Sequence, residues 1–128
     1  MKINTVLPDE SNYLKILTSI AKVPKKLHYS STLPHDRLPT VAIIGTRRPS
    51  AYGREVTQRL SGDLAKRGVV IVSGLALGVD ALAHQAALEA GGTTIAILGN
   101  ALPDISPPRE PRNRRDHYRK RRGYHKRI

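Results

Sequence analysis

The sequence contains no cysteine, no phenylalanine and no tryptophan, and only five tyrosines and one methionine occur in its 128 residues. Without cysteine the chain can form no disulfide framework, no thiolate nucleophile and no thiolate zinc site. No apolar run approaches the roughly 18 residues of a membrane-spanning helix, and the start, MKINTVLPDESN, lacks the apolar centre of a signal peptide. We therefore expect a soluble cytoplasmic protein that has few aromatic side chains to stack on bases.

Positive charge is abundant but unevenly placed along the chain. The formal net charge is +12, yet residues 1–108 hold 12 of the 22 basic and eight of the ten acidic residues, a net of +4. The last twenty residues, REPRNRRDHYRKRRGYHKRI, therefore carry a net charge of +8. This asymmetry indicates a separate basic segment attached to a mildly basic domain.

Three apolar runs alternate with two helical patterns in the middle of the chain. The runs are TVAII (40–44), VVIV (69–72) and TIAIL (94–98), and the helical patterns cover residues 53–68 and 79–92. Strands that are apolar on both faces are typical of a parallel sheet covered by helices on each side. The order predicts an α/β fold, part of a doubly wound, Rossmann-like three-layer sandwich.

We divide the chain into three parts. Residues 1–39 are predicted to be an irregular lead-in, broken by four prolines, in which only NYLKILTSIAK (12–22) has helical spacing. Residues 40–108 are predicted to form the Rossmann-like domain, and residues 109–128 a disordered basic tail.

The turn after the first apolar run, GTRRPSAYG (45–53), has the pattern of a phosphate site. Gly45 allows a tight turn, and the Ser50 hydroxyl is expected to cap the following helix. Amides at a helix start favour an anion, and Arg47 and Arg48 add two permanent charges beside them. An ordinary strand-to-helix turn with two solvated arginines explains the same residues, and the spacing alone leaves both interpretations open.

The turn after the second run, SGLALGVDALAH (73–84), contains glycines for close backbone approach. It also places Asp80 and His84 four residues apart, on one face of a helix. These two side chains form either an acid–base pair or a structural support, and we favour the structural role, with Asp80 as a cap or as the partner of an arginine.

Neither G-x-G-x-x-G nor G-x-x-x-x-G-K-[ST] occurs, which argues against an ordinary dinucleotide or triphosphate-hydrolysis site. We expect no cofactor and no metal. Tyr52 has the ring to stack on a base, but we favour a partly buried tyrosine that packs the loop. His28 and His35 are assigned no function.

Three segments, VAIIGTRRPSAYGREV, VVIVSGLALGVDALAHQAAL and GGTTIAILGNALPDISPP, closely resemble the DprA/Smf family of DNA-processing proteins, in order from about Pro39 to Pro108. The resemblance implies a protein that binds single-stranded DNA and loads the RecA recombinase in natural transformation, without established catalytic turnover. It also implies that Asp80 orients Arg47, with His84 as further support. The resemblance implies a phosphate pocket lined by Gly45, Thr46 and Arg47, with Ser73 and Gly74 as a second wall. From the residues of the turn itself, we add Arg48 and Ser50 to the DNA- or phosphate-binding residues.

The sequence departs from the family pattern near its end. Where the family has Gly-Leu-Asp and then Tyr-Pro, this chain has Ala101-Leu102-Pro103 and Ser106-Pro107. The likeness is expected to end at Pro108, where the family continues with further elements and the surface used for dimerisation and recombinase contact. We therefore expect a truncated domain without that dimer surface, which is either a working DNA-binding unit or an inactive fragment of one.

The tail has the composition of an out-of-frame translation. Read one nucleotide later, Tyr, His and Asp codons become Ile or Thr codons, and AGR arginine codons become Glu or Gly codons. Residues 109–127 can then be read as ENQEIAETIIEKEGAIIKE, which continues the domain with a helix, a glycine stop and the start of a strand. We favour this frameshift over a genuine disordered basic arm.

Two other function classes are weaker. The related nucleoside-monophosphate phosphoribohydrolases share the Rossmann core, but their signature P-G-G-x-G-T-x-x-E is absent here. A small basic RNA-binding protein would depend entirely on the tail.

Overall fold

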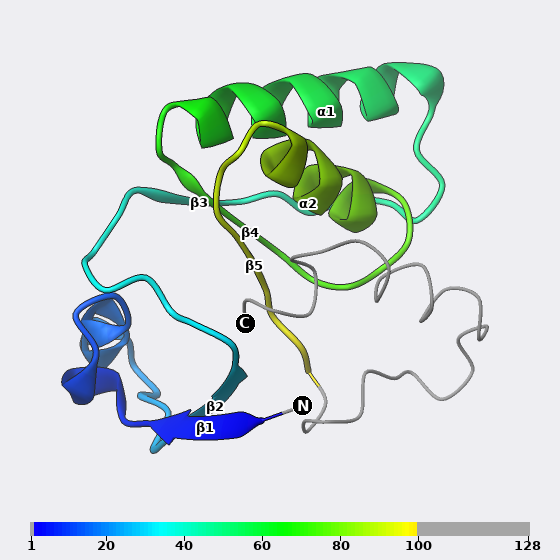
Figure 1. Cartoon of the computed structure of the whole chain (residues 1–128). Helices are drawn as coiled ribbons and strands as arrows, with labels where there is room; N and C mark the ends of the chain where they lie inside the picture. The colour runs from blue at the N-terminus through cyan, green and yellow to red at the C-terminus, as the bar shows by residue number, and fades with distance from the viewer. Residues whose placement is uncertain (1, 100–128) are drawn as a thin grey trace.

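The computed structural model describes residues 2–99, so the predictions for residues 100–108 and for the tail, 109–128, lie outside it (Figure 1). The strands are β1 (Ile3–Val6), β2 (Leu27–Ser30), β3 (Thr40–Ala42), β4 (Val70–Ser73) and β5 (Thr94–Ala96). The helices are α1 (Ala51–Lys66) and α2 (Val79–Glu89), with two short 3-10 helices, η1 (Pro8–Glu10) and η2 (Lys15–Ser19).

Strands β3, β4 and β5 form a parallel sheet in that order. The register pairs Val41 with Ile71 and Val72 with Ile95. Helix α1 connects β3 to β4 and α2 connects β4 to β5, so the predicted alternation of strands and helices is confirmed. This parallel sheet with two crossover helices is the α/β arrangement that the apolar runs predicted.

Both helices lie on the same face of the sheet, where they pack against each other (Figure 1). Ile71 points to this face and packs with Ala65, Ala83 and Ala87. The prediction of helices on each face is wrong in this respect. Each new strand is added on the same side of the previous one, in the order β3, β4, β5. Because crossover connections between parallel strands are right-handed, both helices then lie on the same face of the sheet.

The third layer is the N-terminal segment instead of a helix. Val70, which alternates with Ile71 along β4, packs on the opposite face with Tyr13 and Ile95. The Tyr13 ring is buried, its hydroxyl lies 2.8 Å from Thr40 Oγ1, and the Arg37 guanidinium stacks 4.9 Å from the ring centroid.

The lead-in is more regular than the sequence predicted. β1 pairs with β2 in an antiparallel ladder that runs from Ile3 opposite Ser30 to Val6 opposite Leu27. The helical spacing of residues 12–22 yields only the 3-10 helix η2 (Lys15–Ser19), because so short a segment is a marginal helix and here packs mainly through Tyr13 and Leu14. Strands β1 (INTV) and β2 (LHYS) mix polar and apolar residues and contain no continuous apolar run, so the sequence shows no clear strand signal there.

Small residues let α1 and α2 approach closely. The Ser61 hydroxyl donates a 2.6 Å hydrogen bond to the Ala83 carbonyl across the helix interface. Because both helices run antiparallel to the strands, their N-termini lie at the carboxyl edge of the sheet, where ligands bind in folds of this kind.

Candidate nucleic-acid interface

Two turns meet at the carboxyl edge of the sheet: the first turn (residues 45–50) follows β3, and the second turn (residues 73–78) follows β4. The Val79 amide, at the start of α2, donates a 3.1 Å hydrogen bond to the Thr46 carbonyl. A Cβ on Gly45 would lie 2.8 Å from Val79 Cγ2, so the first turn can lie against α2 only with glycine there. The structure therefore brings the two predicted motifs together.

The first turn is fixed by its own side chains. The Thr46 hydroxyl accepts a 3.1 Å hydrogen bond from the Arg48 amide. Ser50 is the N-cap of α1 and accepts a 3.0 Å hydrogen bond from the Gly53 amide, which confirms the predicted cap. Thr46 and Ser50 therefore shape the loop, whatever else they contact.

The start of α1 offers donors to a ligand. Within residues 2–99, the amides of Ala51 and Tyr52 donate no hydrogen bond. They lie in the first turn of a 16-residue helix, whose N-terminal end carries partial positive charge. Arg47 and Arg48 precede them and are solvent-exposed. Exposed amides with two arginines beside them form a place where an anion is favoured.

Ser73 and Gly74 are less accessible than a binding wall would be. Ser73 is 2% exposed, and its hydroxyl donates a 2.6 Å hydrogen bond to the Ile43 carbonyl, which ties the end of β4 to β3. Gly74 is half-buried above the start of α2. The Ser73 hydroxyl is thus used inside the fold.

Asp80 supports the second turn. Its Oδ2 accepts a 3.2 Å hydrogen bond from the Ala76 amide, and a Cβ on Gly74 would lie 2.7 Å from the same oxygen. The Asp80 carboxylate is buried. That Asp80 also orients Arg47 stays a prediction.

His84 is fully buried between α2 and the sheet. Its Nε2 lies 2.7 Å from the Gly74 carbonyl oxygen, and its Nδ1 lies 2.5 Å from Thr94 Oγ1. Burial lowers the pKa of His84, although the hydrogen bond to Gly74 and the negative charge of Asp80 act in the opposite direction. The imidazole is therefore neutral near pH 7 and makes structural contacts.

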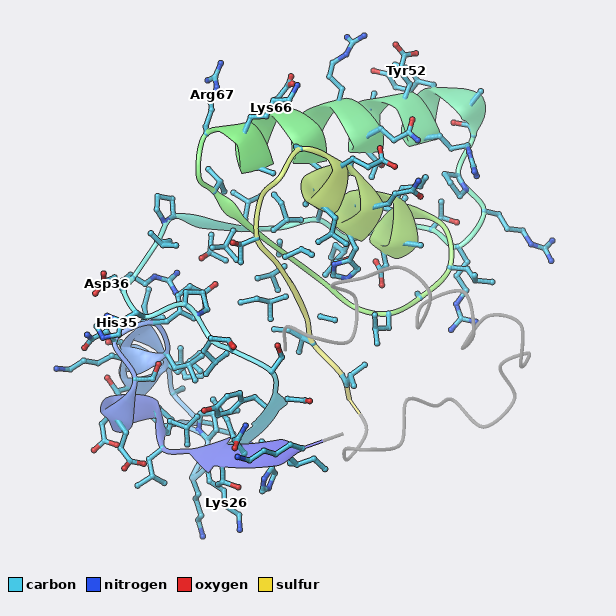
Figure 2. All side chains as sticks on the ribbon, in the orientation of Figure 1. Lys26, His35, Asp36, Tyr52, Lys66 and Arg67 are labelled. Carbon is cyan, nitrogen blue, oxygen red and sulfur yellow. The ribbon has the colours of Figure 1, made fainter. Side chains whose placement is uncertain are left out.

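The Tyr52 side chain is more exposed than predicted. Its side chain is 76% exposed, at the N-terminal end of α1, and it points away from α2 (Figure 2). The expectation of a partly buried tyrosine that packs the loop is wrong, because the second position of α1 faces solvent. His35 lies beside Asp36 on the exposed loop before β3 (Figure 2). His28 contacts the Thr5 hydroxyl on β1. Neither histidine therefore belongs to the site.

Sequence reasoning missed Thr94 and an apolar cavity. Thr94 is a buried residue at the start of β5, and no motif marks it. The cavity, of about 560 Å³, lies between the sheet and the N-terminal segment, and Tyr13, Leu33 and Ile95 contribute to its walls. It includes none of the predicted site residues, which lie at the carboxyl edge of the sheet.

The described part of the chain contains no group of three or more His, Cys, Asp or Glu side chains that could hold a metal ion. Neither α1 nor α2 combines the length and the hydropathy that crossing a lipid bilayer requires, and residues 2–99 hold no other candidate span.

A parallel sheet with an exposed, arginine-bearing turn beside a helix N-terminus defines a Rossmann-like protein with an exposed basic edge. The chain belongs to the DNA recombination-mediator protein A family, whose profile matches residues 4–122. This confirms the resemblance to DprA/Smf proteins. The match also extends past Pro108, so the expected end of the likeness at that residue is wrong, because part of the basic tail aligns with the family as well.

Known relatives are longer than this chain. It is 43% identical over 105 residues to protein Smf of Synechocystis, covering 79% of this chain and 26% of that protein. It is 41% identical over 80 residues to the DNA processing protein DprA of Bacillus subtilis, covering 62% of this chain and 27% of that protein. The chain thus spans about a quarter of the length of these curated relatives.

Solved structures show the same fold. The DNA processing protein A of Streptococcus pneumoniae superposes with a TM-score of 0.74 at 34% identity, covering 91% of this chain and 41% of that one. The protein of the same name from Helicobacter pylori gives a TM-score of 0.65 at 36% identity, covering 84% of this chain and 47% of that one.

Proposed function

We propose that this chain binds single-stranded DNA at the edge formed by the first turn and the start of α1. The observation that carries the proposal is the exposure of Arg47 and Arg48 beside the amides of Ala51 and Tyr52. Guanidinium groups and helix N-terminal amides both favour phosphate oxygens, so a DNA backbone has donors along this edge. Gly45, Thr46 and Ser50 hold the loop in the conformation that presents them.

Family membership supports DNA as the anion. The Helicobacter pylori relative has a single-stranded-DNA-binding mode, and the family is one of recombination mediators. We extend the proposal to loading of the RecA recombinase on single-stranded DNA during natural transformation, in the cytoplasm. The exposed Tyr52 supports a single strand over a duplex, because an unpaired base can stack on an accessible ring.

The same proposal includes the absence of catalysis. Asp80 and His84 are the acid and the base that could serve hydrolysis, but both are buried and hydrogen-bonded to the backbone of the second turn. A general base must reach the proton that it removes, and neither side chain is placed to do so. Binding therefore accounts for the geometry better than phosphoribohydrolase chemistry does.

The test is a titration of a fluorescently labelled oligothymidylate, followed by anisotropy at about 150 mM salt. Arg47→Ala should weaken binding by about 1.5–3 kcal/mol, the usual value of a charge-assisted hydrogen bond. Tyr52→Phe should bind like the unmodified chain, whereas Tyr52→Ala should bind more weakly, since the ring alone is needed for stacking.

Arg67→Ala is the matched control, because Arg67 is an exposed arginine at the other end of α1 (Figure 2). Both variants lose one positive charge, so any general electrostatic effect is the same in both. Equal affinities for Arg47→Ala and Arg67→Ala would exclude the first turn as the binding edge.

A further inference from the structure

An apolar cavity of about 560 Å³ lies on the face of the sheet opposite α1 and α2. Ala42, Val72 and Ile95 form its sheet side, and the facing wall comes from the N-terminal segment, with Leu17 of η2 and Leu27 of β2. These N-terminal elements lie together, apart from the two helices (Figure 1). The volume is in the range of about 300–1,000 Å³ that is usual for small-molecule sites. The cavity contains no residue of the first turn, so it is separate from the proposed DNA edge.

Apolar side chains of this cavity are left open to solvent. Ile16 is 55% exposed and Ile97 is 60% exposed, although both contribute to the walls. The Tyr13 ring, in contrast, is buried and packs with Val70 and Ile95 at one side of the cavity. An apolar ligand that covers Ile16 and Ile97 removes their surface from water, and this removal is favourable.

The charged groups of the walls select the charge of the ligand. Lys26 and Arg37 line the cavity, and no aspartate or glutamate is among its described wall residues. Within residues 2–99, neither cation forms an ion pair, and the neighbouring Asp36 contacts His35 instead. The Arg37 guanidinium donates a 3.0 Å hydrogen bond from Nη1 to the Tyr13 carbonyl oxygen, but it carries five N–H donors. Both exposed cations can therefore receive a carboxylate.

We propose that this cavity binds an amphipathic carboxylate, an unbranched aliphatic chain of medium length that ends in a carboxylate group. The chain lies against Val72, Ile95 and the other apolar walls, and the carboxylate contacts Lys26 and Arg37. A peptide fits the same walls less well, because its backbone N–H and C=O groups need partners that apolar side chains do not supply. The site is independent of DNA binding at the first turn, and neither proposal rests on the other.

Calorimetric titration of the full chain with sodium dodecanoate, below the concentration at which it forms micelles, tests the class of ligand. Dodecanoate should bind at a single site. Octanoate should bind more weakly, by about two- to fourfold for each methylene group that it lacks, the factor expected when each methylene is buried. Dodecyltrimethylammonium, with the same chain and the opposite charge, should bind at least about tenfold more weakly. Equal affinities for the anion and the cation, or no binding of dodecanoate, would overturn the proposal.

Ala42→Phe tests whether the ligand occupies the cavity. Ala42 is exposed on β3 and lines the cavity, so a phenyl ring there takes up space that the aliphatic chain needs. The variant should bind dodecanoate at least about tenfold more weakly. Ala21→Phe is the matched control, because Ala21 is exposed and lies outside the cavity walls, and it should bind normally. Equal binding by the two variants would exclude the cavity as the site.

Lys26→Met tests the position of the carboxylate. Lys26 directly precedes β2 (Figure 2), and the replacement removes its charge while it keeps an apolar side chain. Affinity for dodecanoate should fall by about two- to fivefold, as expected for one exposed charge contact. Lys25→Met is the matched control, because Lys25 is exposed and does not line the cavity, and it should bind normally. If both variants weaken binding equally, only net charge matters and the proposed contact of the carboxylate is wrong.

The unmodified chain provides a measurement that does not depend on the variants folding. In carbon-13 NMR spectra, dodecanoate should shift the methyl resonances of Val72 and Ile95, which line the cavity. Shifts confined to other methyl groups would contradict the proposal. So would a chain that sediments as a dimer and takes up no dodecanoate, because a second copy of the chain would then fill the cavity.

Discussion

Gly78 is where the two turns meet, and its replacement by alanine tests the packing of the candidate site. Its φ of 79° and ψ of −125° lie in a region that residues with a side chain rarely adopt. A Cβ there would lie 2.5 Å from the Arg47 carbonyl oxygen and would also overlap the Thr46 carbonyl oxygen. Both neighbours are backbone atoms, so the first turn has to move.

The expected loss has two parts. The unfavourable backbone conformation costs about 1–3 kcal/mol for a residue other than glycine, and steric overlap in a packed region costs about 1–3 kcal/mol more. We therefore expect Gly78→Ala to lower the free energy of unfolding by about 2–6 kcal/mol, measured by urea denaturation. Because the overlap displaces Thr46 and Arg47, affinity for single-stranded DNA should fall as well.

Gly68→Ala provides the matched control. Gly68 also has a positive φ, of 83°, but a Cβ there would meet no atom within 4 Å. It should cost only the backbone term, about 1–2 kcal/mol, and should leave DNA affinity unchanged. If the two variants lose the same stability and bind DNA equally, the close packing of the two turns does not position the site.

Three further predictions concern charge. Burial lowers the pKa of His84 from 6.5, so the contribution of the neutral ring to stability is complete above about pH 6.5 and declines as the pH falls towards the lowered pKa. The urea midpoint should therefore drop between about pH 7.5 and pH 5. It should drop less in His84→Gln, which has no titrating ring. Asp80→Asn should lower the pKa of His84 further, since the Asp80 charge raises it, and an unchanged ring titration by NMR would contradict that contact. If residues 109–128 are a genuine basic arm, about eight phosphate contacts imply a loss of three to five decades in affinity from 50 to 200 mM salt. Deleting the arm should flatten this slope, and a slope that survives the deletion would exclude the arm as the electrostatic contact.

The central part of the fold could be predicted because its signals are local. Each of the runs 40–44, 69–72 and 94–98 is apolar on both faces and ends near glycine, and these limits agree with β3, β4 and β5 within a few residues. The Ser50 cap is likewise encoded locally, since the Ser50 hydroxyl accepts from the Gly53 amide three residues on.

The contacts that were missed are long-range. Tyr13 covers the free face of the sheet by bonding Thr40, 27 residues away, and no periodicity links the two. That Asp80 orients Arg47 stays a prediction; its carboxylate accepts from the Ala76 amide, four residues earlier in the chain. Tyr52 was expected to be partly buried, yet its place on the outer side of α1 exposes it.

Whether residues 109–128 are translated in the correct reading frame is decided by the nucleotide sequence of the gene. The family profile reaches residue 122, whereas the frameshift interpretation assigns residues 109–128 to a different frame. The nucleotide sequence around codons 106–130 decides between them: a single-base change that restores the family pattern supports the frameshift, and an intact frame supports a basic arm.

The most direct test of the central claim is an NMR titration of the full chain with a short oligothymidylate, following each backbone amide. We predict the largest shifts at Thr46, Arg47, Ala51 and Tyr52, the exposed first turn and the first two residues of α1. The same experiment with Arg47→Ala should remove most of them. Shifts confined to residues 109–128, with the first turn unchanged, would contradict the account.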